Sequence, residues 1–414
     1  MRVLFITSSY PASEQDPRGT FIHVLARSLV EQGVEVTVLA PGAPGAPKQE
    51  QRDGVEIHRA TYWMPRWQCL ATGLAGILPN LRAKPWIVVQ IPTFMLALTW
   101  CAWRLARGHD IVHAHWLYPA GVAGAIAARV RRKPFMVTIH GSDLTLAKGS
   151  ALFTCAVRWT VKQAHSCVAV SEALADALRT LGTSPGIVSF IPCGVESPRR
   201  SRGLGTATTS VWRQFADSTL PKFLFIGRLV KEKSVDTLLA AAAMTSKAGA
   251  QAIYGIVGDG PARTSLGRMA REAKDVQIMF AGACAPDEIA SWLEEADALV
   301  LTSLSEGRPV VVMEAMASAR AVIASDLPGV RELVDDGVTG MLFPPGDIAA
   351  LASVLQRAIQ DRTHLTVLGR NGASRLHAEG LSAATSARCY RCLYARLLMG
   401  EGSLAIGDDD GRGC

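Results

Sequence analysis

Residues 298–314 read ALVLTSLSEGRPVVVME, and this stretch decides how the second half of the chain is interpreted. The apolar run Ala298–Ser303 is short and ends in small polar residues, as a buried strand does. Pro309 suits the first turn of a helix, where its missing N–H is no loss, and Pro309–Ala319 continues as that helix. Glu306 is therefore predicted in the loop, and Glu314 about 7.5 Å further along the helix axis.

The two glutamates flank a predicted helix N-terminus, whose free amides and positive dipole end bind anions such as phosphate. An acid that accepts from hydroxyls, a phosphate cradle and a second acid match a sugar, a diphosphate and a ribose in this order. Two surface glutamates beside a helix start would give the same pattern, since short motifs often match by chance. The rest of the chain must decide between these interpretations.

Length and composition predict a folded protein of two domains. The chain has 414 residues, of which 49% are hydrophobic and 19% charged. Residues 1–200 hold 21 Lys and Arg against 12 Asp and Glu, whereas residues 201–414 hold 22 against 24. The basic first half suits an anionic membrane surface or an anionic substrate. Nucleic acid is not expected, because there is no zinc-finger spacing and no helix dense in Lys and Arg.

The nine cysteines lie in apolar segments and are expected to be reduced core residues. The start, MRVLFITSSYP, lacks the long apolar region and cleavage site of a signal peptide, so secretion is not expected. Cys389 and Cys392 form a CxxC pair, but no second pair completes a zinc site. No metal is predicted.

The first half begins with a strand, a helix and a second strand, predicted at Val3–Thr7, Thr20–Gln32 and Val34–Ala40. This order favours a doubly wound parallel sheet. Gly19 lies where the first loop meets its helix, the usual place for phosphate to approach the backbone. His140 ends a later predicted strand in the sequence His140-Gly-Ser-Asp143, and strand ends are where open α/β sheets hold ligands. A structural role for His140 is equally consistent with the pattern.

Further elements of the first half complete the alternation. Strands are predicted at Ile111–His115, Phe135–His140 and Cys167–Val170, and helices at Pro119–Val130, Ala151–Ala164 and Ser171–Leu181, the last with Ser171 as its N-cap.

Trp86–Leu105 is nearly long enough to span a bilayer, but Pro92 and several polar residues interrupt it. A buried or interfacial helix is predicted instead, and nearby tryptophans and arginines make shallow membrane contact one of two readings. The other is an ordinary core helix.

Residues 198–218 are rich in Pro, Gly, Ser, Thr and Arg and are predicted to link the two domains. A second β/α set follows, with Arg228 and Lys233 in its first strand–helix loop and a tight turn at Gly258–Pro261. Arg and Lys in such a loop can clamp a diphosphate, or can be two solvated cations. The predicted parts are residues 1–197, the linker 198–218, residues 219–380, a helix in 381–400 and a disordered tail 401–414.

The remaining elements predicted for the second half follow the same alternation. Strands are expected at Phe223–Gly227, Ala252–Val257, Val276–Ala281, Ala321–Ser325 and Gly340–Phe343, and helices from about Ser234 and at Pro286–Glu295, Asp347–Gln360, His364–Glu379 and Ser382–Met399.

Taken together, these motifs resemble glycosyltransferase family 4, retaining nucleotide-sugar enzymes of the GT-B fold, over nearly the whole chain. The matching pieces, in their order, are Gly19 with its helix, His113-Ala-His115-Trp116, His140-Gly-Ser-Asp143, Gly227-Arg228 with Lys233, Gly258-Asp-Gly-Pro261, and Glu306 with Glu314. The resemblance implies an α/β protein of two Rossmann-like doubly wound domains that face a central cleft. It also implies that the last helix crosses back to the N-terminal domain.

The resemblance also implies roles for individual residues. Glu306 and His140 would be catalytic, and Glu314 would bind the donor ribose. The donor diphosphate would be bound by Arg228, Lys233, Gly19 and the segment Pro309, Val310 and Val311, and the acceptor side would hold His115 and Asp143. Arg18 replaces a glycine that is common in the family, and Arg308 replaces an apolar residue and could add a phosphate contact.

The implied reaction is transfer of a sugar from a nucleoside diphosphate to an acceptor hydroxyl with retention, without metal or other cofactor. The implied acceptor is a lipid-linked glycan of bacterial surface or exported polysaccharide synthesis, which places the enzyme at the inner face of the cytoplasmic membrane. A sugar phosphorylase, a nucleotide-sugar epimerase and a non-catalytic nucleotide-sugar-binding scaffold remain alternatives. A dehydrogenase is disfavoured, because the first βα turn lacks G-x-G-x-x-G.

Overall fold

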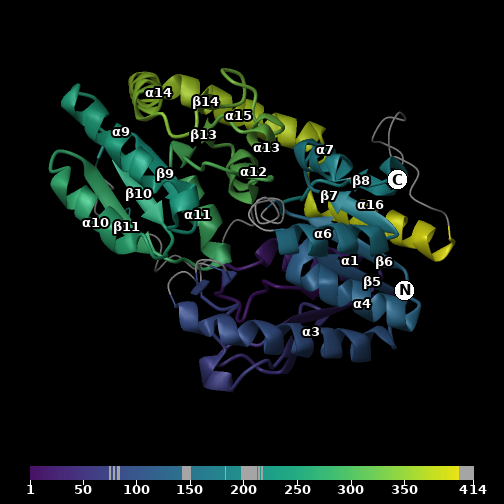
Figure 1. The fold of residues 1–414 in the computed structure, drawn as a ribbon. Coiled ribbons are helices and arrows are strands. Elements are labelled where there is room, and N and C mark those ends of the chain that lie inside the picture. Colours follow the sequence, from purple (N-terminus) through teal and green to yellow (C-terminus); the bar gives the residue numbers. More distant parts are fainter. Residues whose placement is uncertain are drawn as a thin grey trace. The chain divides into compact units, whose positions relative to one another are not determined.

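The computed structural model describes residues 1–73, 76–77, 80–81, 84–141, 151–181, 183–196, 212, 215 and 218–400. The chain divides into two compact units. The first unit contains Met1–Ser13, Arg18–Gly194 and the chain from Ala383 onward, and the second contains Glu14–Pro17 and Val195–Ser382 (Figure 1). The predicted linker, residues 198–218, and the predicted tail, residues 401–414, lie almost wholly outside the described residues.

The first unit is built on an eight-stranded sheet with the order β3-β4-β2-β1-β5-β6-β7-β8. Its pairs are parallel except for β3 with β4. The strands are β1 (Arg2–Thr7), β2 (Glu35–Pro41), β3 (Gln49–Arg52), β4 (Val55–Ala60), β5 (Ile111–His115), β6 (Phe135–Ile139), β7 (Ser166–Ala169) and β8 (Val188–Phe190). Most of these strands are buried along their length, as expected for a parallel sheet covered on both faces.

Helices cover both faces of this sheet. They are α1 (Thr20–Glu31), α3 (Gln90–Ala106), α4 (Val122–Arg131), α6 (Ala151–Gln163), α7 (Glu172–Thr180) and α16 (Ala383–Leu398). The last helix, α16, packs against α1 in this unit, and α3 lies along α4 (Figure 1). Short turns are η1 (Pro65–Trp67), η2 (Pro85–Val89), η3 (Leu117–Gly121) and η4 (Pro185–Ile187).

The second unit is built on a six-stranded, all-parallel sheet with the order β11-β10-β9-β12-β13-β14. Its strands are β9 (Lys222–Ile226), β10 (Ile253–Val257), β11 (Gln277–Gly282), β12 (Ala298–Leu301), β13 (Ala321–Ser325) and β14 (Met341–Phe343). Its helices are α9 (Val235–Lys247), α10 (Arg263–Glu272), α11 (Ile289–Glu294), α12 (Val310–Ala317), α13 (Pro328–Arg331), α14 (Ile348–Gln360) and α15 (Arg362–Ala378), with the turns η5 (Lys231–Lys233) and η6 (Pro286–Glu288).

Most predicted elements are present, and the differences have local causes. The antiparallel β3–β4 hairpin was not predicted, because its first strand, QEQR, carries no apolar residue. Pro92 does not interrupt α3 as expected. It is the third residue of that helix, and a proline in the first turn removes no hydrogen bond. The predicted helix Pro119–Val130 begins only at Val122, after the turn η3.

The helix α3 has one buried and one exposed apolar face. Phe94, Leu98, Ala102 and Ala106 are fully buried in the core of the first unit. On the other side, the exposed fraction is 71% for Leu96 and 58% for Trp100. Together with η2, the segment Pro85–Ala106 is long and apolar enough to cross a membrane, judged by length and composition alone.

Candidate functional site

The second unit carries one group of predicted site residues at the point where its strand order reverses. From β9, consecutive strands run outward through β10 and β11 on one side, and from β12 through β13 and β14 on the other. β9 and β12 are paired through Phe223 with Ala298 and Leu224 with Leu299, near the start of each strand. Loops that leave the carboxyl ends of two such strands form the usual ligand site of an open α/β sheet.

Lys233 and Glu306 meet at this point. Lys233 Nζ donates to Glu306 Oε1 at 2.5 Å, and the two side chains are only 19% and 12% exposed. The loops that carry them are also tied by their backbones, because Leu304 N donates to the Glu232 carbonyl and Thr302 Oγ1 to the Lys233 carbonyl. The loop after β9 and the loop after β12 therefore form one structural element.

The N-terminus of α12 follows Glu306 directly. Pro309 is the N-cap in an extended conformation, so the helix begins at Val310, one residue later than predicted. The first N–H groups of a helix have no acceptor within it, which leaves the amides of Val310 and Val311 at its positive end. Within the predicted diphosphate-binding segment, Pro309 cannot donate a hydrogen bond, because proline has no N–H; it starts the helix.

Glu314 lies one turn into α12. Burial raises the pKa of its carboxyl to about 7. The thiol of Cys284 lies in the loop after β11. Burial raises the pKa of this thiol to about 12, and the negative charges of Glu288 and Glu314 raise it further. Near pH 7 this carboxyl is about half ionised, and hydroxyl groups that donate to its ionised form would stabilise that form.

Arg228 is exposed in the same loop as Lys233. The turn after β10 is hydrogen-bonded to this loop, because Leu229 N donates to the Asp259 carbonyl at 2.9 Å. Gly258 has a φ of 137°, and a Cβ there would lie 1.9 Å from the Gly227 carbonyl oxygen. Only glycine allows the two loops to approach this closely.

Arg308 does not point toward the predicted phosphate site. Its side chain is buried, and Nη1 donates to Glu332 Oε2 at 3.1 Å. The expectation of an extra phosphate contact from Arg308 is therefore replaced by a structural ion pair with the end of α13. The loop it belongs to is crowded there, because a Cβ on Gly329 would lie 1.9 Å from the Gly307 carbonyl oxygen.

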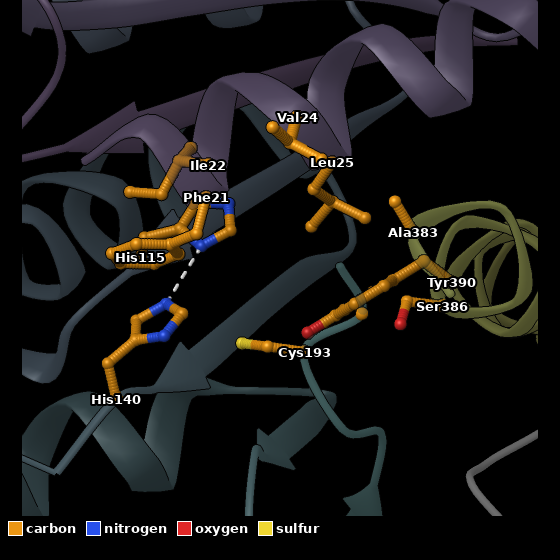
Figure 2. A pocket seen from close by; sticks show the side chains of 11 residues that line it. Phe21, Ile22, Val24, Leu25, His115, His140, Cys193, Ala383, Ser386 and Tyr390 are labelled. Carbon is orange, nitrogen blue, oxygen red and sulfur yellow. Dashed lines mark hydrogen bonds between the residues drawn. The ribbon is translucent and has the colours of Figure 1, made fainter. Parts of the chain in front are cut away.

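The first unit carries the second group of predicted residues next to the point where its strand order reverses, which lies between β1 and β5. His115 ends β5 and His140 directly follows β6. His115 Nδ1 and His140 Nε2 are 3.1 Å apart, and their rings stack with centroids 5.4 Å apart (Figure 2). Phe21 of α1 contacts the His140 ring, with centroids 4.8 Å apart.

Burial keeps this pair uncharged at neutral pH. It lowers the pKa of His140 to about 3, and that of His115 falls well below its usual value from burial and from the neighbouring His113 and His140. One ring nitrogen of the pair must carry the shared proton. His115 Nε2 is buried without a partner among the described residues, and a buried lone pair is tolerated better than a buried N–H. We therefore assign the shared proton to His115 Nδ1, which leaves His140 with its own proton on Nδ1.

Two tyrosines of α16 bind the residues next to this pair on β5 and β6, and the His113 ring contacts the His115 ring with centroids 4.4 Å apart. Tyr394 Oη lies 2.7 Å from His113 Nδ1, and His113 Nε2 lies 2.8 Å from Thr138 Oγ1, which lies 3.1 Å from Tyr390 Oη. Tyr390, His115 and His140 line a cavity of about 20 Å³, room for about one water molecule (Figure 2). The sequence signal for this network was the spacing of Tyr390 and Tyr394, one turn apart on the last helix, which was not recognised.

Gly19 is the N-cap of α1 with a φ of 65°, and a Cβ there would lie 2.5 Å from the Ser9 carbonyl oxygen. The loop after β1 therefore needs glycine at this position. Arg18, beside it, donates to the Ala71 carbonyl at 3.0 Å. The remaining predicted acceptor-side residue, Asp143, lies outside the described residues.

No group of three or more His, Cys, Asp or Glu side chains that could hold a metal ion occurs in the part of the chain that the structure describes.

Two family models match the chain. The model "Glycosyltransferase Family 4" matches residues 19–199, and the model "Glycosyl transferases group 1" matches residues 208–375. The interval between the two models, residues 200–207, follows the change from the first unit to the second, which falls between Gly194 and Val195.

Relatives of known name are similar over most of their length. A 2-deoxystreptamine glucosyltransferase of Streptomyces kanamyceticus is 28% identical over 87% of this chain and 96% of its own. A D-inositol 3-phosphate glycosyltransferase of Streptomyces bingchenggensis is 30% identical over 92% of this chain and 84% of its own.

Solved structures show the same fold. Sucrose-phosphate synthase from Thermosynechococcus elongatus has a TM-score of 0.76 at 21% identity and covers 97% of this chain and 100% of its own. HepE from Anabaena, solved with UDP-glucose, has a TM-score of 0.72 at 20% identity, with 97% and 100% covered. The two parallel-sheet units are thus those of the GT-B fold.

Proposed function

The chain belongs to glycosyltransferase family 4, and we propose that it moves a sugar from a nucleoside diphosphate to an acceptor hydroxyl with retention at the anomeric carbon. The observation that carries this proposal is the contact of Lys233 with Glu306 directly before the N-terminus of α12. A cation, a carboxylate and two free helix amides then lie at the switch point of one sheet, where an anionic ligand binds.

The donor would lie along this sequence of groups. Arg228, Lys233 and the amides of Val310 and Val311 would contact the diphosphate, and Glu314 would accept hydrogen bonds from the ribose hydroxyls. HepE, a structural neighbour, is solved with UDP-glucose, which supports a nucleoside diphosphate sugar as donor. Glu306 would bind the donor sugar through the carboxylate oxygens that Lys233 leaves available.

Bond cleavage places negative charge on the leaving diphosphate. Two cations and a helix N-terminus fixed around it lower the barrier without reorganisation, so the proposed reaction needs no metal. Glu306 is a poor nucleophile in this arrangement, because Lys233 neutralises its charge at 2.5 Å. The acceptor oxygen would therefore attack from the side that the diphosphate leaves, and its proton would pass to the departing phosphate oxygen.

His140 would act on the sugar as a neutral donor. With its pKa lowered to about 3 by burial, it offers an N–H and no positive charge. An uncharged N–H can donate to a sugar hydroxyl, whereas a charged imidazolium would also attract the diphosphate. The acceptor we propose is a lipid-linked glycan, and the exposed apolar face of α3 supports it. His115 and Asp143 would belong to the acceptor side of the site.

The first test is thermal unfolding of the protein with UDP, GDP, ADP and TDP. A nucleotide at about 100 times its dissociation constant stabilises the folded state by about 2.7 kcal/mol. We expect one nucleotide to stabilise the wild type and the Arg268→Ala control, an exposed arginine on α10, but not Arg228→Ala. Equal stabilisation of Arg228→Ala would overturn its assigned role.

The second test uses the sugar nucleotide of the base so identified, with lipid-linked and soluble acceptors. The anomeric configuration of the product, read by proton NMR, distinguishes retention from inversion. A covalent sugar adduct on Glu306 would contradict front-face attack. Release of sugar phosphate on addition of inorganic phosphate would identify a phosphorylase, and nucleotide binding without turnover would identify a scaffold.

A further inference from the structure

The helix α3 is apolar on both of its long faces, and only one is covered. Phe94, Leu98 and Ala102 lie fully buried against the sheet. The opposite face carries Leu96 and Trp100, which lie one turn apart, and Val89 of η2 directly precedes the helix; all three are more than half exposed. A surface helix of a soluble protein normally carries polar residues there. An apolar outer face calls for an apolar partner.

Two tryptophans extend this exposed face beyond the helix. Trp67 of η1 and Trp86 of η2 contact each other edge to face, with centroids 6.5 Å apart. They are 55% and 52% exposed, and Met64 beside them is 63% exposed. Tryptophan is enriched where one side of a ring meets hydrocarbon and the other meets polar headgroups. We call Met64, Trp67, Trp86, Val89, Leu96 and Trp100 the α3 surface.

The segment of chain that carries the α3 surface holds charges of one sign. The sequence contains no acidic residue between Glu56 and Asp110, and it contains six basic ones: Arg59, Arg66, Arg82, Lys84, Arg104 and Arg107. Of these, Arg59 is buried and paired with Glu50. Arg104 and Arg107 are exposed and follow Trp100 at the fourth and seventh positions, on the same side of the helix. Arg66 and Lys84 are exposed beside Trp67 and Trp86.

We propose that the α3 surface docks the protein on an anionic lipid bilayer, with α3 lying in the headgroup region parallel to the membrane plane. In a bacterial cell this would be the inner face of the cytoplasmic membrane. Apolar and aromatic side chains with flanking cations are what such a surface binds, and a negative leaflet attracts each nearby Lys or Arg. The proposal holds whatever reaction the protein catalyses, because it rests on a surface of the first unit alone.

A transmembrane position for α3 is disfavoured by its inner face. A crossing would withdraw Phe94, Leu98 and Ala102 from the core, where they are 0–1% exposed. The helix is also held from its end, because Arg131 of α4 donates to the Trp103 carbonyl and stacks on its ring at 4.1 Å. Docking leaves all these contacts unchanged.

The test is co-sedimentation of the purified full chain with vesicles of phosphatidylcholine alone or mixed with phosphatidylglycerol. We expect binding to the mixed vesicles, weakened by salt. Leu96→Ser with Trp100→Ser should weaken it roughly tenfold for each side chain removed. Arg104→Gln with Arg107→Gln should weaken it roughly fivefold for each cation.

The matched control is Val338→Ser with Val367→Ser, which removes two side chains of the second unit that are 54% and 46% exposed. It should bind vesicles like the wild type, and all variants should keep the wild-type unfolding midpoint. Binding that is insensitive to the α3 variants overturns the proposal. Protein that resists alkaline extraction from vesicles would indicate a membrane span and would also overturn it. The same holds if the protein does not bind lipid but self-associates, and Leu96→Ser with Trp100→Ser abolishes the self-association.

Discussion

In the first unit the carboxyl ends of β5 and β6 carry His115 and His140, whereas in the second the loops after β9 and β12 carry Lys233 and Glu306. The second pair lies where the strand order of its sheet reverses, between β9 and β12. In the first unit the reversal falls between β1 and β5, so His115 lies at it and His140 lies one strand away. The first pair is buried, aromatic and uncharged, and the second is an ion pair beside a helix N-terminus. Under the proposed function, two sheets of similar geometry would serve two kinds of ligand: the neutral pair would bind sugar hydroxyls, and the charged pair would bind a diphosphate.

The two pairs are also fixed in different ways. The strands that carry the histidines are bound by side chains of α16, because Tyr394 contacts His113 of β5 and Tyr390 contacts Thr138 of β6. The Lys233 and Glu306 loops are held by main-chain bonds from Leu304 to Glu232 and by close glycine contacts. Substitutions can remove the side-chain contacts one hydroxyl at a time. The main-chain hydrogen bonds change only if the backbone conformation changes.

The largest expected effect is on catalysis, and it tests whether the position of Lys233 in the charged pair matters. Lys233→Ala should reduce kcat/KM for the donor by about a thousandfold, because it removes a proposed ligand of the leaving diphosphate and leaves the mostly buried Glu306 without its partner. Lys231→Ala, an exposed lysine of the same turn, is the control and should change it little. Equal losses in both variants would mean that net charge, and not the Lys233 position, matters.

The second prediction tests the neutral pair. His140→Ala should reduce transfer by about a hundredfold while nucleotide binding, measured by calorimetry, stays at the wild-type value. The separation follows because the proposed diphosphate ligands all belong to the second unit. His58→Ala, on β4 of the same unit, controls for the loss of an imidazole. Loss of nucleotide affinity in His140→Ala would break the division of labour between the units.

The third prediction concerns pH, because burial shifts the two sites in opposite directions. Burial raises the pKa of the Glu314 carboxyl to about 7, so the folded state binds its proton more tightly than the unfolded state does. The stability from this proton is fully present below the unfolded pKa and is lost as pH rises through about 7. His140 has its pKa lowered to about 3, so its contribution is present above the unfolded pKa near 6.5 and is lost as pH falls toward 3.

Ribose hydroxyls should bind the ionised form of Glu314. Nucleotide affinity should therefore rise roughly tenfold as pH increases from about 6 to well above 7, where the carboxyl is fully ionised. In Glu314→Gln this rise should disappear, and the fall in stability between about pH 4.5 and 7 should shrink. Calorimetric titration and thermal unfolding across this range measure both effects. A variant that keeps the pH dependence of binding would assign it to another group.

Local pattern predicted the βα alternation, the motif around Glu306 and the N-cap at Ser171, because such features are decided within a few residues. It did not predict that Lys233 pairs with Glu306, 73 positions away, or that Arg308 turns to Glu332, because those contacts depend on which strands become neighbours. His115 and His140 were singled out separately, and only the pairing of β5 with β6 brings them together. Tyr390 and Tyr394 were missed because hydroxyls on an amphipathic helix look like ordinary surface residues.

The smallest expected effect asks whether the two units unfold as one. Ser171 caps α7 in the first unit by accepting from Leu174 N, and Asp347 caps α14 in the second by accepting from Ala350 N at 2.9 Å. Replacing either by Ala should destabilise its own unit by about 1 kcal/mol. If the units unfold separately, calorimetry of Ser171→Ala should lower one transition and Asp347→Ala the other. A single transition lowered equally by both variants would show that the units unfold cooperatively, and the contrast between their sites would then lie in chemistry alone.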